Sequence, residues 1–214
     1  GPRRIKGDMT PIFYSFRRCP YAMRARLAIA AAGITVELRE VVLRDKPAAF
    51  LAASDSGTVP CLVTDQGNID ESLDIMKWAL ARNDTDHWLD MRDTGWDLIT
   101  RADGPFKDAL DRTKYASRYS DTDAKEQREV AAEFLTELDS RIAVWIFDRP
   151  SIADFAILPF VRQFAFIDKP WFDAQPWPNL QGWLDRFLAT DQFENIMLKY
   201  PQWSEGDAPT FFPD

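Results

Sequence analysis

A cysteine stands where the sequence predicts that a helix begins. Cys19 is followed by Pro20, and proline suits the first helical position, where its missing N–H costs nothing. A thiol there faces unpaired backbone N–H groups and the positive end of the helix dipole, and Arg17 and Arg18 come directly before it. These three influences favour the thiolate, so Cys19 is the candidate nucleophile. The alternative is a buried and inert structural cysteine.

The residues around Cys19 predict the elements that hold it. Residues 11–16 form an apolar run typical of a short buried strand, and residues 20–32 predict a helix that the following glycine ends. Apolar residues recur along one side of that helix, while Arg24 and Arg26 lie off it, so we expect the helix to pack on one side only. A thiol between strand and helix lies near the carboxyl edge of a sheet, where sites of α/β folds gather.

The next segments predict a second strand, a short helix and a hairpin. Residues 34–42 are β-branched and alternate, which favours a strand parallel to the first. Residues 48–53 predict one or two helical turns. Val59 and Pro60 precede an apolar strand, and we expect a cis bond between them. Cys61, inside that strand, should be a packing residue.

Two polar side chains stand at the start of the helix predicted over residues 73–80. The N–H groups of this helix start can bind a ligand carboxylate together with the Ser72 hydroxyl, and the Glu71 carboxylate can bind a ligand ammonium group. The alternative is ordinary N-capping by Ser72 with an acidic residue beside it.

The second half of the chain predicts helices only. A polar linker at 82–87 separates a first domain at 9–81 from an all-α domain at 88–214. Prolines such as Pro105 divide this half into helical windows near 88–102, 106–116, 122–146, 151–167, 178–190 and 191–199. The sequence from Ser151 to Asp154 predicts a capping box that opens a core helix. Six aromatic residues could line a substrate pocket or belong to the core: Trp171, Trp177, Trp183, Trp203, Phe211 and Phe212.

Composition excludes several classes of partner. The 214 residues hold 26 Lys and Arg against 34 Asp and Glu, a net charge of −8 that argues against nucleic acid or an anionic membrane as the main partner. No apolar run approaches the length of a membrane span. Two dispersed cysteines predict neither a disulfide framework nor a metal site, so we expect no metal and a cytoplasmic location. His87, the only histidine, should be a solvated or capping residue.

These motifs, in this order, resemble the cytosolic glutathione transferases, and most of all the omega class and its bacterial relatives. The closest likeness is the run Cys19-Pro20-Tyr21-Ala22-x-Arg24-x-Arg26-Leu27 with Gly33-Ile34. Lys46-Pro47, Thr58-Val59-Pro60 and Glu71-Ser72 follow at matching intervals, and the Ser151 to Asp154 box extends the likeness to the second half. The resemblance implies an α/β plus all-α fold: a thioredoxin-like N-terminal domain followed by an all-helical C-terminal domain.

The resemblance also implies a glutathione site in the first domain. Its residues would be Tyr21, Lys46, Val59, Pro60, Glu71 and Ser72. Val59 would bind the cysteinyl backbone of glutathione, Glu71 and Ser72 its γ-glutamyl end, and Lys46 its glycyl carboxylate. Tyr21 stands where the class has an aromatic residue beside the thiol.

Cys19 would then form a mixed disulfide with glutathione, which serves as co-substrate. Ala22 stands where dithiol glutaredoxins have a resolving cysteine, so a second glutathione must release the product. The expected activity is thiol transfer or reduction of a small glutathionylated, oxidised or electrophilic substrate, by a homodimer. Two alternatives remain: a non-catalytic glutathione-binding or protein-interaction module, and conjugation of glutathione through Ser15 or Tyr14.

Overall fold

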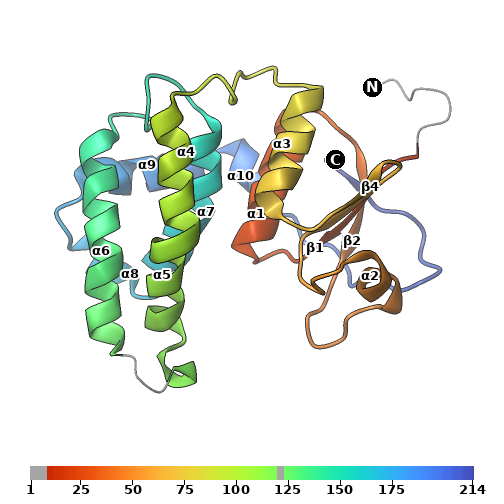
Figure 1. Cartoon of the computed structure of the whole chain (residues 1–214), viewed down its shortest axis with the longest axis horizontal. Coiled ribbons are helices and arrows are strands. Elements are labelled where there is room, and N and C mark those ends of the chain that lie inside the picture. Colours follow the sequence, from red (N-terminus) through yellow and green to blue (C-terminus); the bar gives the residue numbers. More distant parts are fainter. Residues whose placement is uncertain (1–8, 120–122) are drawn as a thin grey trace. The chain divides into compact units, whose positions relative to one another are not determined.

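A mixed β-sheet forms the centre of the first part of the chain in the computed structural model, which describes residues 9–119 and 123–214 (Figure 1). The strands lie in the order β4-β3-β1-β2-β5. Their bounds are β1 Ile12–Ser15, β2 Val36–Glu40, β3 Cys61–Thr64, β4 Gly67–Ile69 and β5 Phe211–Phe212. β1 and β2 pair in parallel, as predicted, while the β1–β3, β3–β4 and β2–β5 pairs are antiparallel.

Two helices lie side by side in this part of the chain, α1 (Pro20–Ala31) and α3 (Ser72–Arg82), and a short helix, α10 (Asp191–Ile196), also packs against α1. Gly33 follows α1 with a φ of 66°, a conformation that suits glycine and ends the helix as predicted. Because side chains alternate along β1, Phe13 and Ser15 point to one face of the sheet and Tyr14 to the other. Ser15 contacts α1, which identifies the face that α1 covers.

The opposite face of the sheet carries a second apolar cluster. Tyr14 and Cys61 pack there with Val41 and with Phe50 of α2 (Ala48–Ala53). The Tyr14 ring lies 5.3 Å from that of Phe50. The Tyr14 hydroxyl accepts a hydrogen bond of 2.8 Å from Arg39. The short helix predicted at 48–53 therefore serves to close this face.

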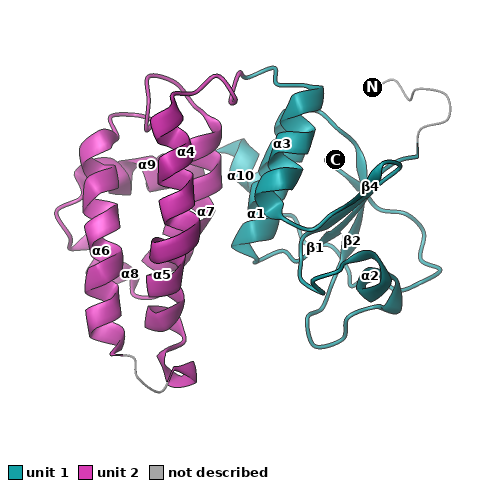
Figure 2. Ribbon diagram, in the orientation of Figure 1, with its two compact units in different colours: residues 1–86, 190–214 teal, residues 87–189 magenta. Residues whose placement is uncertain are grey.

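The chain divides into two compact units at residue 86 (Figure 2). The second unit is His87–Ala189, so the division falls at the predicted linker, but Thr190–Asp214 group with the first unit. This corrects the expected all-α domain of 88–214. The physical reason is that α10 packs on α1 and β5 adds a strand beside β2, with Val36 opposite Phe212. These contacts join residues too far apart in sequence for local patterns to predict.

The second unit consists of helices around the buried helix α7. Its elements are α4 (Asp93–Arg101), η1 (Ala102–Phe106), α5 (Lys107–Lys114), η2 (Ala116–Arg118), α6 (Ala124–Arg141), α7 (Ile152–Ala165), α8 (Lys169–Asp173) and α9 (Pro178–Leu188). α7 packs against α4, α5 and α9. None of the described helices is both long and apolar enough to cross a membrane.

The capping box at the start of α7 is present as predicted. The Asp154 carboxylate is fully buried and accepts hydrogen bonds from Ser151, from the Ile146 N–H at 3.0 Å and from the Trp183 indole at 3.0 Å. Burial raises the pKa of this carboxyl, and these hydrogen bonds oppose the rise. Asp154 therefore joins the start of α7 to α9 and to the loop that precedes α7.

Two helix boundaries were predicted wrongly. Pro105 does not separate two helices: it lies inside the wider π-helical turn η1, which connects α4 to α5 without a break. A wider turn accommodates a residue that has no N–H and whose ring would clash with an ordinary α-helical turn. The window 122–146 was too long, since α6 ends at Arg141, and its first residue lies outside the described part of the chain.

The six aromatic residues have different environments. Trp177 and Trp183 belong to the core of the second unit, whereas Trp171 is partly exposed there. Trp203, Phe211 and Phe212 were assigned to the all-α domain and lie in the first unit instead.

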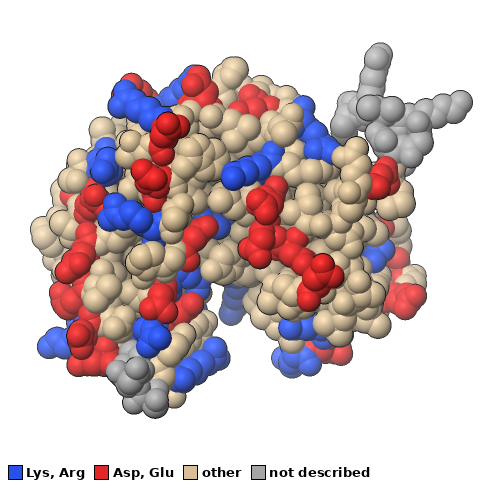
Figure 3. Space-filling view, viewed as in Figure 1, with Lys and Arg blue, Asp and Glu red and all other residues tan. Residues whose placement is uncertain are grey.

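On the face shown in Figure 3, Asp and Glu side chains are spread over both units with Lys and Arg among them, and they leave no continuous basic surface in this view.

Candidate functional site

Cys19 is the N-cap residue of α1, as predicted. Its backbone is extended, with φ of −71° and ψ of 121°, and Pro20 begins the helix. The Cys19 N–H donates to Phe16 O at 3.1 Å, and Cys19 O accepts the first helical hydrogen bond, from Met23 N at 2.9 Å. Cys19 is half-buried, and neither cysteine of the chain forms a disulfide. A partly accessible thiol therefore lies at the N-terminus of a helix.

Arg26 was predicted to lie off the packed side of α1, and this was wrong. Arg24 and Arg26 are 1% and 2% exposed, and most of α1 is buried. The Arg26 guanidinium donates hydrogen bonds to Ser15 Oγ at 2.7 Å and to the carbonyl oxygens of Arg17 at 2.6 Å, Phe16 at 3.3 Å and Ile196 at 2.8 Å. It thus joins the loop that carries Cys19 to α10. Residues 190–214 contact Arg26, and α3 contacts Arg24, so both parts of α1 left open in the prediction are covered.

The buried Arg26 charge interacts with the Cys19 thiolate. Burial lowers the pKa of Arg26 to about 10, while the charges of Glu40 and then of Cys19 oppose this change. The interaction is mutual, so the guanidinium favours the thiolate form of Cys19. Arg17 and Arg18 were predicted to be the nearby cations, and Arg26 was not. No local signal marks its burial, because an arginine off the apolar face of a helix ordinarily faces water.

Glu40 holds the other side of the Cys19 loop. Its carboxylate accepts the Arg17 N–H at 2.8 Å, and Arg17 Nε donates to Met197 O at 2.8 Å. Burial raises the pKa of Glu40, and the Arg17 N–H and the charges of Arg26 and Arg17 lower it. The loop before Cys19 is therefore fixed from both β2 and the segment after α10.

Two of the expected glutathione residues, Val59 and Pro60, lie at the same edge of the sheet as Cys19. Tyr14 pairs with Cys61, so the chain that leaves β1 toward Cys19 passes beside the residue that enters β3. The Val59–Pro60 bond is cis, which confirms the prediction. Among the described residues, the Val59 backbone forms no hydrogen bond with another backbone group. An extended ligand could pair with it as an added strand.

Lys46 contacts the segment that comes just before Val59. Its ammonium group is exposed and donates to Gly57 O at 2.9 Å, two residues before Val59. The structure thus brings Lys46 to the segment that contains Val59, although the two residues come from different elements. A cation at this place can bind a carboxylate of a ligand that pairs with Val59.

The structure contradicts one of the two interpretations of this helix start, N-capping by Ser72. Glu71 is the N-cap of α3, is exposed and makes no capping hydrogen bond. Ser72 is the first helical residue and is buried, and its hydroxyl accepts a hydrogen bond of 3.3 Å from Arg24 of α1. Ser72 is therefore not the N-cap. Arg24 also lies 6.0 Å from the Tyr21 ring, so Tyr21 and Ser72 flank the same guanidinium.

The other candidate nucleophiles are buried. Ser15 is 0% exposed and Tyr14 is 2% exposed, and burial raises the pKa of the Tyr14 hydroxyl despite its hydrogen bond to Arg39. Burial, and then Asp70, raise the pKa of Cys61 to about 12, which agrees with its predicted packing role. His87 is exposed, as expected. In the ranges 9–119 and 123–214, no three or more His, Cys, Asp or Glu side chains are grouped so as to hold a metal ion.

Two family models match the chain. The model described as the N-terminal domain of glutathione S-transferase matches residues 13–87, and the model described as its C-terminal domain matches residues 97–186. Together they cover most of both compact units. They confirm the predicted order of a thioredoxin-like domain followed by an all-helical domain.

Curated relatives match over shorter segments. A probable glutathione transferase of Aplysia californica is 47% identical over 57 residues, which are 27% of this chain and 62% of that protein. Glutathione S-transferase omega-1 of Sus scrofa is 39% identical over 56 residues, 26% of this chain and 23% of that protein. The matches thus span less than two thirds of these relatives.

Solved structures match over most of the chain. A glutathione transferase of Pseudomonas putida, with one glutathione disulfide bound per subunit, has a TM-score of 0.74 and 17% identity, covering 88% of this chain and 90% of that one. At this identity the likeness shows the shared fold.

Proposed function

The chain belongs to the glutathione transferase family, and from that premise we propose that it is a glutathione-dependent thiol transferase or reductase that acts through Cys19. The observation that carries the proposal is the environment of this thiol. It is partly accessible, it lies at the N-terminus of α1, and the buried Arg26 interacts with its negative charge. A structural cysteine requires none of these features.

The first step of the proposed reaction is an attack by the Cys19 thiolate on a glutathionylated substrate. Its sulfur forms a bond to the glutathione sulfur, the original S–S bond breaks, and the substrate leaves as a thiolate that takes up a proton from water. The helix N-terminus and Arg26 stabilise the attacking anion. The product is a mixed disulfide between Cys19 and glutathione.

The second step needs an external thiol. Ala22 stands one helical turn after Cys19, where a resolving cysteine would have to be, and Cys61 is buried. A second glutathione, as thiolate, attacks the glutathione sulfur of the mixed disulfide. Glutathione disulfide forms and the Cys19 thiolate is released. One free glutathione is therefore consumed for each substrate disulfide reduced, and the glutathione carried by the substrate becomes the other half of the glutathione disulfide.

The glutathione moiety would lie along the sheet edge next to Cys19. We assign its cysteinyl backbone to Val59 beside Pro60, its glycyl carboxylate to Lys46, and its γ-glutamyl end to Glu71 and Ser72. The open Val59 backbone and the exposed charges of Lys46 and Glu71 support this assignment. Tyr21 would cover the ligand near the thiol. The glutathione disulfide bound in the Pseudomonas putida structure supports glutathione as the ligand.

Conjugation through a hydroxyl group is less well supported by the side chains present. Ser15 and Tyr14 are both buried, and each hydroxyl is hydrogen-bonded to an arginine, Arg26 and Arg39 respectively. The raised pKa of Tyr14 disfavours a phenolate. These observations favour Cys19 as the reacting group.

The proposal is tested by replacing Cys19 and measuring turnover. The substrate is the mixed disulfide of glutathione and 2-mercaptoethanol, and glutathione disulfide formation is followed by coupling to glutathione reductase. Cys19→Ala and Cys19→Ser should both lose turnover, because neither side chain provides a thiolate, while Cys19→Ser should still bind glutathione in calorimetry. The matched control is Cys61→Ala, which should keep turnover.

Full turnover by Cys19→Ala would overturn the proposal. If wild-type protein binds glutathione but shows no turnover, a non-catalytic binding module takes its place. Activity with chloro-dinitrobenzene that survives Cys19→Ala would instead indicate conjugation by another group.

A further inference from the structure

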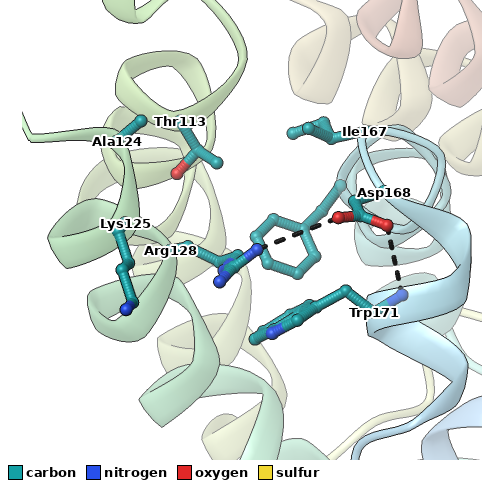
Figure 4. Close-up of a pocket in the computed structure, with 8 residues that line it drawn as sticks. Thr113, Ala124, Lys125, Arg128, Ile167, Asp168 and Trp171 are labelled. Atoms are coloured by element: carbon teal, nitrogen blue, oxygen red, sulfur yellow. Dashed lines mark hydrogen bonds and ion pairs between the residues drawn. The ribbon is translucent and has the colours of Figure 1, made fainter.

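A pocket of about 380 Å³ lies within the second unit, between the end of α5, the start of α6 and the segment from α7 to α8 (Figure 4). Phe164, Ile167 and Trp171 give it an apolar lining. Lys125 and Arg128 of α6 also line it, and Asp168 faces Arg128 from the segment before α8. None of these residues has a part in the site around Cys19.

Arg128 is held in place but is not saturated with hydrogen bonds. Its guanidinium carbon lies 4.2 Å from the centre of the Trp171 ring, and Figure 4 shows the group above the indole. Its Nε is buried and has no hydrogen-bond partner among the described residues. The nearest acid is Asp168, whose oxygen is 3.9 Å from Nη1, which is too long for a hydrogen bond. A buried N–H without a partner is uncommon, and the guanidinium that carries it belongs to a residue that lines the pocket.

The acid in the pocket has another role. One Asp168 oxygen accepts the Trp171 N–H at 3.2 Å and caps the start of α8, and about half of its side chain is exposed to water. It therefore offsets only part of the charge of Arg128. Lys125 adds a second cation to the lining, so the pocket has two positive side chains and one negative.

We propose that this pocket binds a small aromatic carboxylate. The two terminal nitrogens of a guanidinium match the two oxygens of a carboxylate, and the Trp171 ring fixes the orientation of the Arg128 guanidinium. Phe164 and Ile167 provide the apolar surface for an aromatic ring attached to that carboxylate. The volume lies within the range of small-molecule sites, which is about 300–1,000 Å³. A neutral ligand would leave Asp168, at 3.9 Å, to offset the Arg128 charge.

The test uses naphthoate and its neutral analogue naphthamide, titrated into the full chain by isothermal calorimetry. Naphthoate should bind with one site and naphthamide should bind at least tenfold more weakly. Arg128→Gln should weaken naphthoate binding by about ten- to a hundredfold, as expected when a charge-assisted hydrogen-bond pair is lost. Arg128→Lys should have an intermediate affinity, because it keeps the charge without the paired N–H groups.

The matched control is Arg141→Gln. It makes the same charge change on the same helix, about 20 Å further along, where Arg141 pairs with Glu137 at the surface. This variant should bind naphthoate like the wild type. Ala124→Trp, which changes no charge and fills the pocket from the start of α6, should abolish binding, provided that its circular dichroism matches the wild type.

Three results would overturn the proposal. One is equal binding of naphthoate and naphthamide. Another is unchanged affinity in both Arg128→Gln and Ala124→Trp. The third is competition between naphthoate and glutathione that persists in Arg128→Gln, which would place the anion in the glutathione site. Loss of turnover in Cys19→Ala has no bearing on any of these results, since the pocket shares no residue with that site.

Discussion

Two replacements of Arg26 should distinguish its effect on the reactivity of Cys19 from its effect on the stability of the chain. Arg26→Met removes the charge and all the hydrogen bonds while keeping a long apolar side chain. Arg26→Lys keeps a positive charge, but it cannot supply all the hydrogen bonds that the guanidinium makes to Ser15, to the Cys19 loop and to the end of α10. Arg26→Met should therefore lower both the reactivity of Cys19 and the stability of the chain, whereas Arg26→Lys should lower mainly the stability.

Two magnitudes follow from this structure. Arg26 is 2% exposed, and removing one member of a buried charged network costs about 3–5 kcal/mol, so Arg26→Met should lose that much free energy of unfolding. The loss of a neighbouring positive charge disfavours the thiolate, and we expect a roughly tenfold lower thiolate fraction at mildly acidic pH. Iodoacetamide should therefore alkylate Cys19 of Arg26→Met about tenfold more slowly at mildly acidic pH.

The assay is the rate of alkylation as a function of pH, with peptide mapping to distinguish Cys19 from Cys61, beside urea unfolding of each variant. Arg24→Met is the matched control, since Arg24 is equally buried on α1 but donates to Ser72. It should lose stability and keep the alkylation profile. Equal rates for Arg26→Met and Arg26→Lys would refute the electrostatic role of Arg26. A similar slowing in Arg24→Met would show that loosening of α1, and not charge, controls the thiol.

Three further predictions concern other groups. The pKa of Cys61 is about 12 in the folded chain, above the ordinary value of 9.0. Between these two pH values the thiol ionises only in the unfolded chain, so the free energy of unfolding should fall by about 1.4 kcal/mol per pH unit. Cys61→Ala should remove this slope. Asp154→Asn should lose about 3–5 kcal/mol in urea unfolding, because buried donors lose a charged acceptor, while exposed Asp148→Asn should change stability by less than about 0.5 kcal/mol. By family likeness we expect a homodimer, and light scattering that gives a mass near 24.6 kDa at micromolar concentration would contradict this.

The first unit could be predicted up to residue 82 because its signals are local. Pro20 and Gly33 mark the ends of α1, alternation marks β2, and the element order from β1 to α3 agrees with the structure. The capping box at Ser151 is likewise contained in four residues, and it was predicted together with the core helix that it opens.

The burial of Arg26 could not be predicted from local pattern. A charged residue off the apolar stripe of a helix ordinarily faces water, and here that side of α1 is covered by a segment 170 residues further along the chain. The pocket beside Arg128 was missed for the same reason, since Trp171 and Arg128 come from different helices and meet only in the folded unit. The spacing of residues predicts which face of a helix is apolar, but it does not predict which distant segment covers the other faces.

The return of residues 190–214 to the first unit has a consequence for synthesis on the ribosome. The second unit is continuous in sequence and can fold as soon as it emerges, whereas the sheet that holds Cys19 still lacks β5 and the acceptor at Ile196 when residue 86 has left the tunnel. Its last contacts join residues separated by nearly the whole chain, and such contacts form slowly. During the rest of translation Cys19 therefore lies near Arg26 while Arg26 still lacks its acceptor at Ile196. The complete environment of Cys19 can form only after the all-α unit has been synthesised.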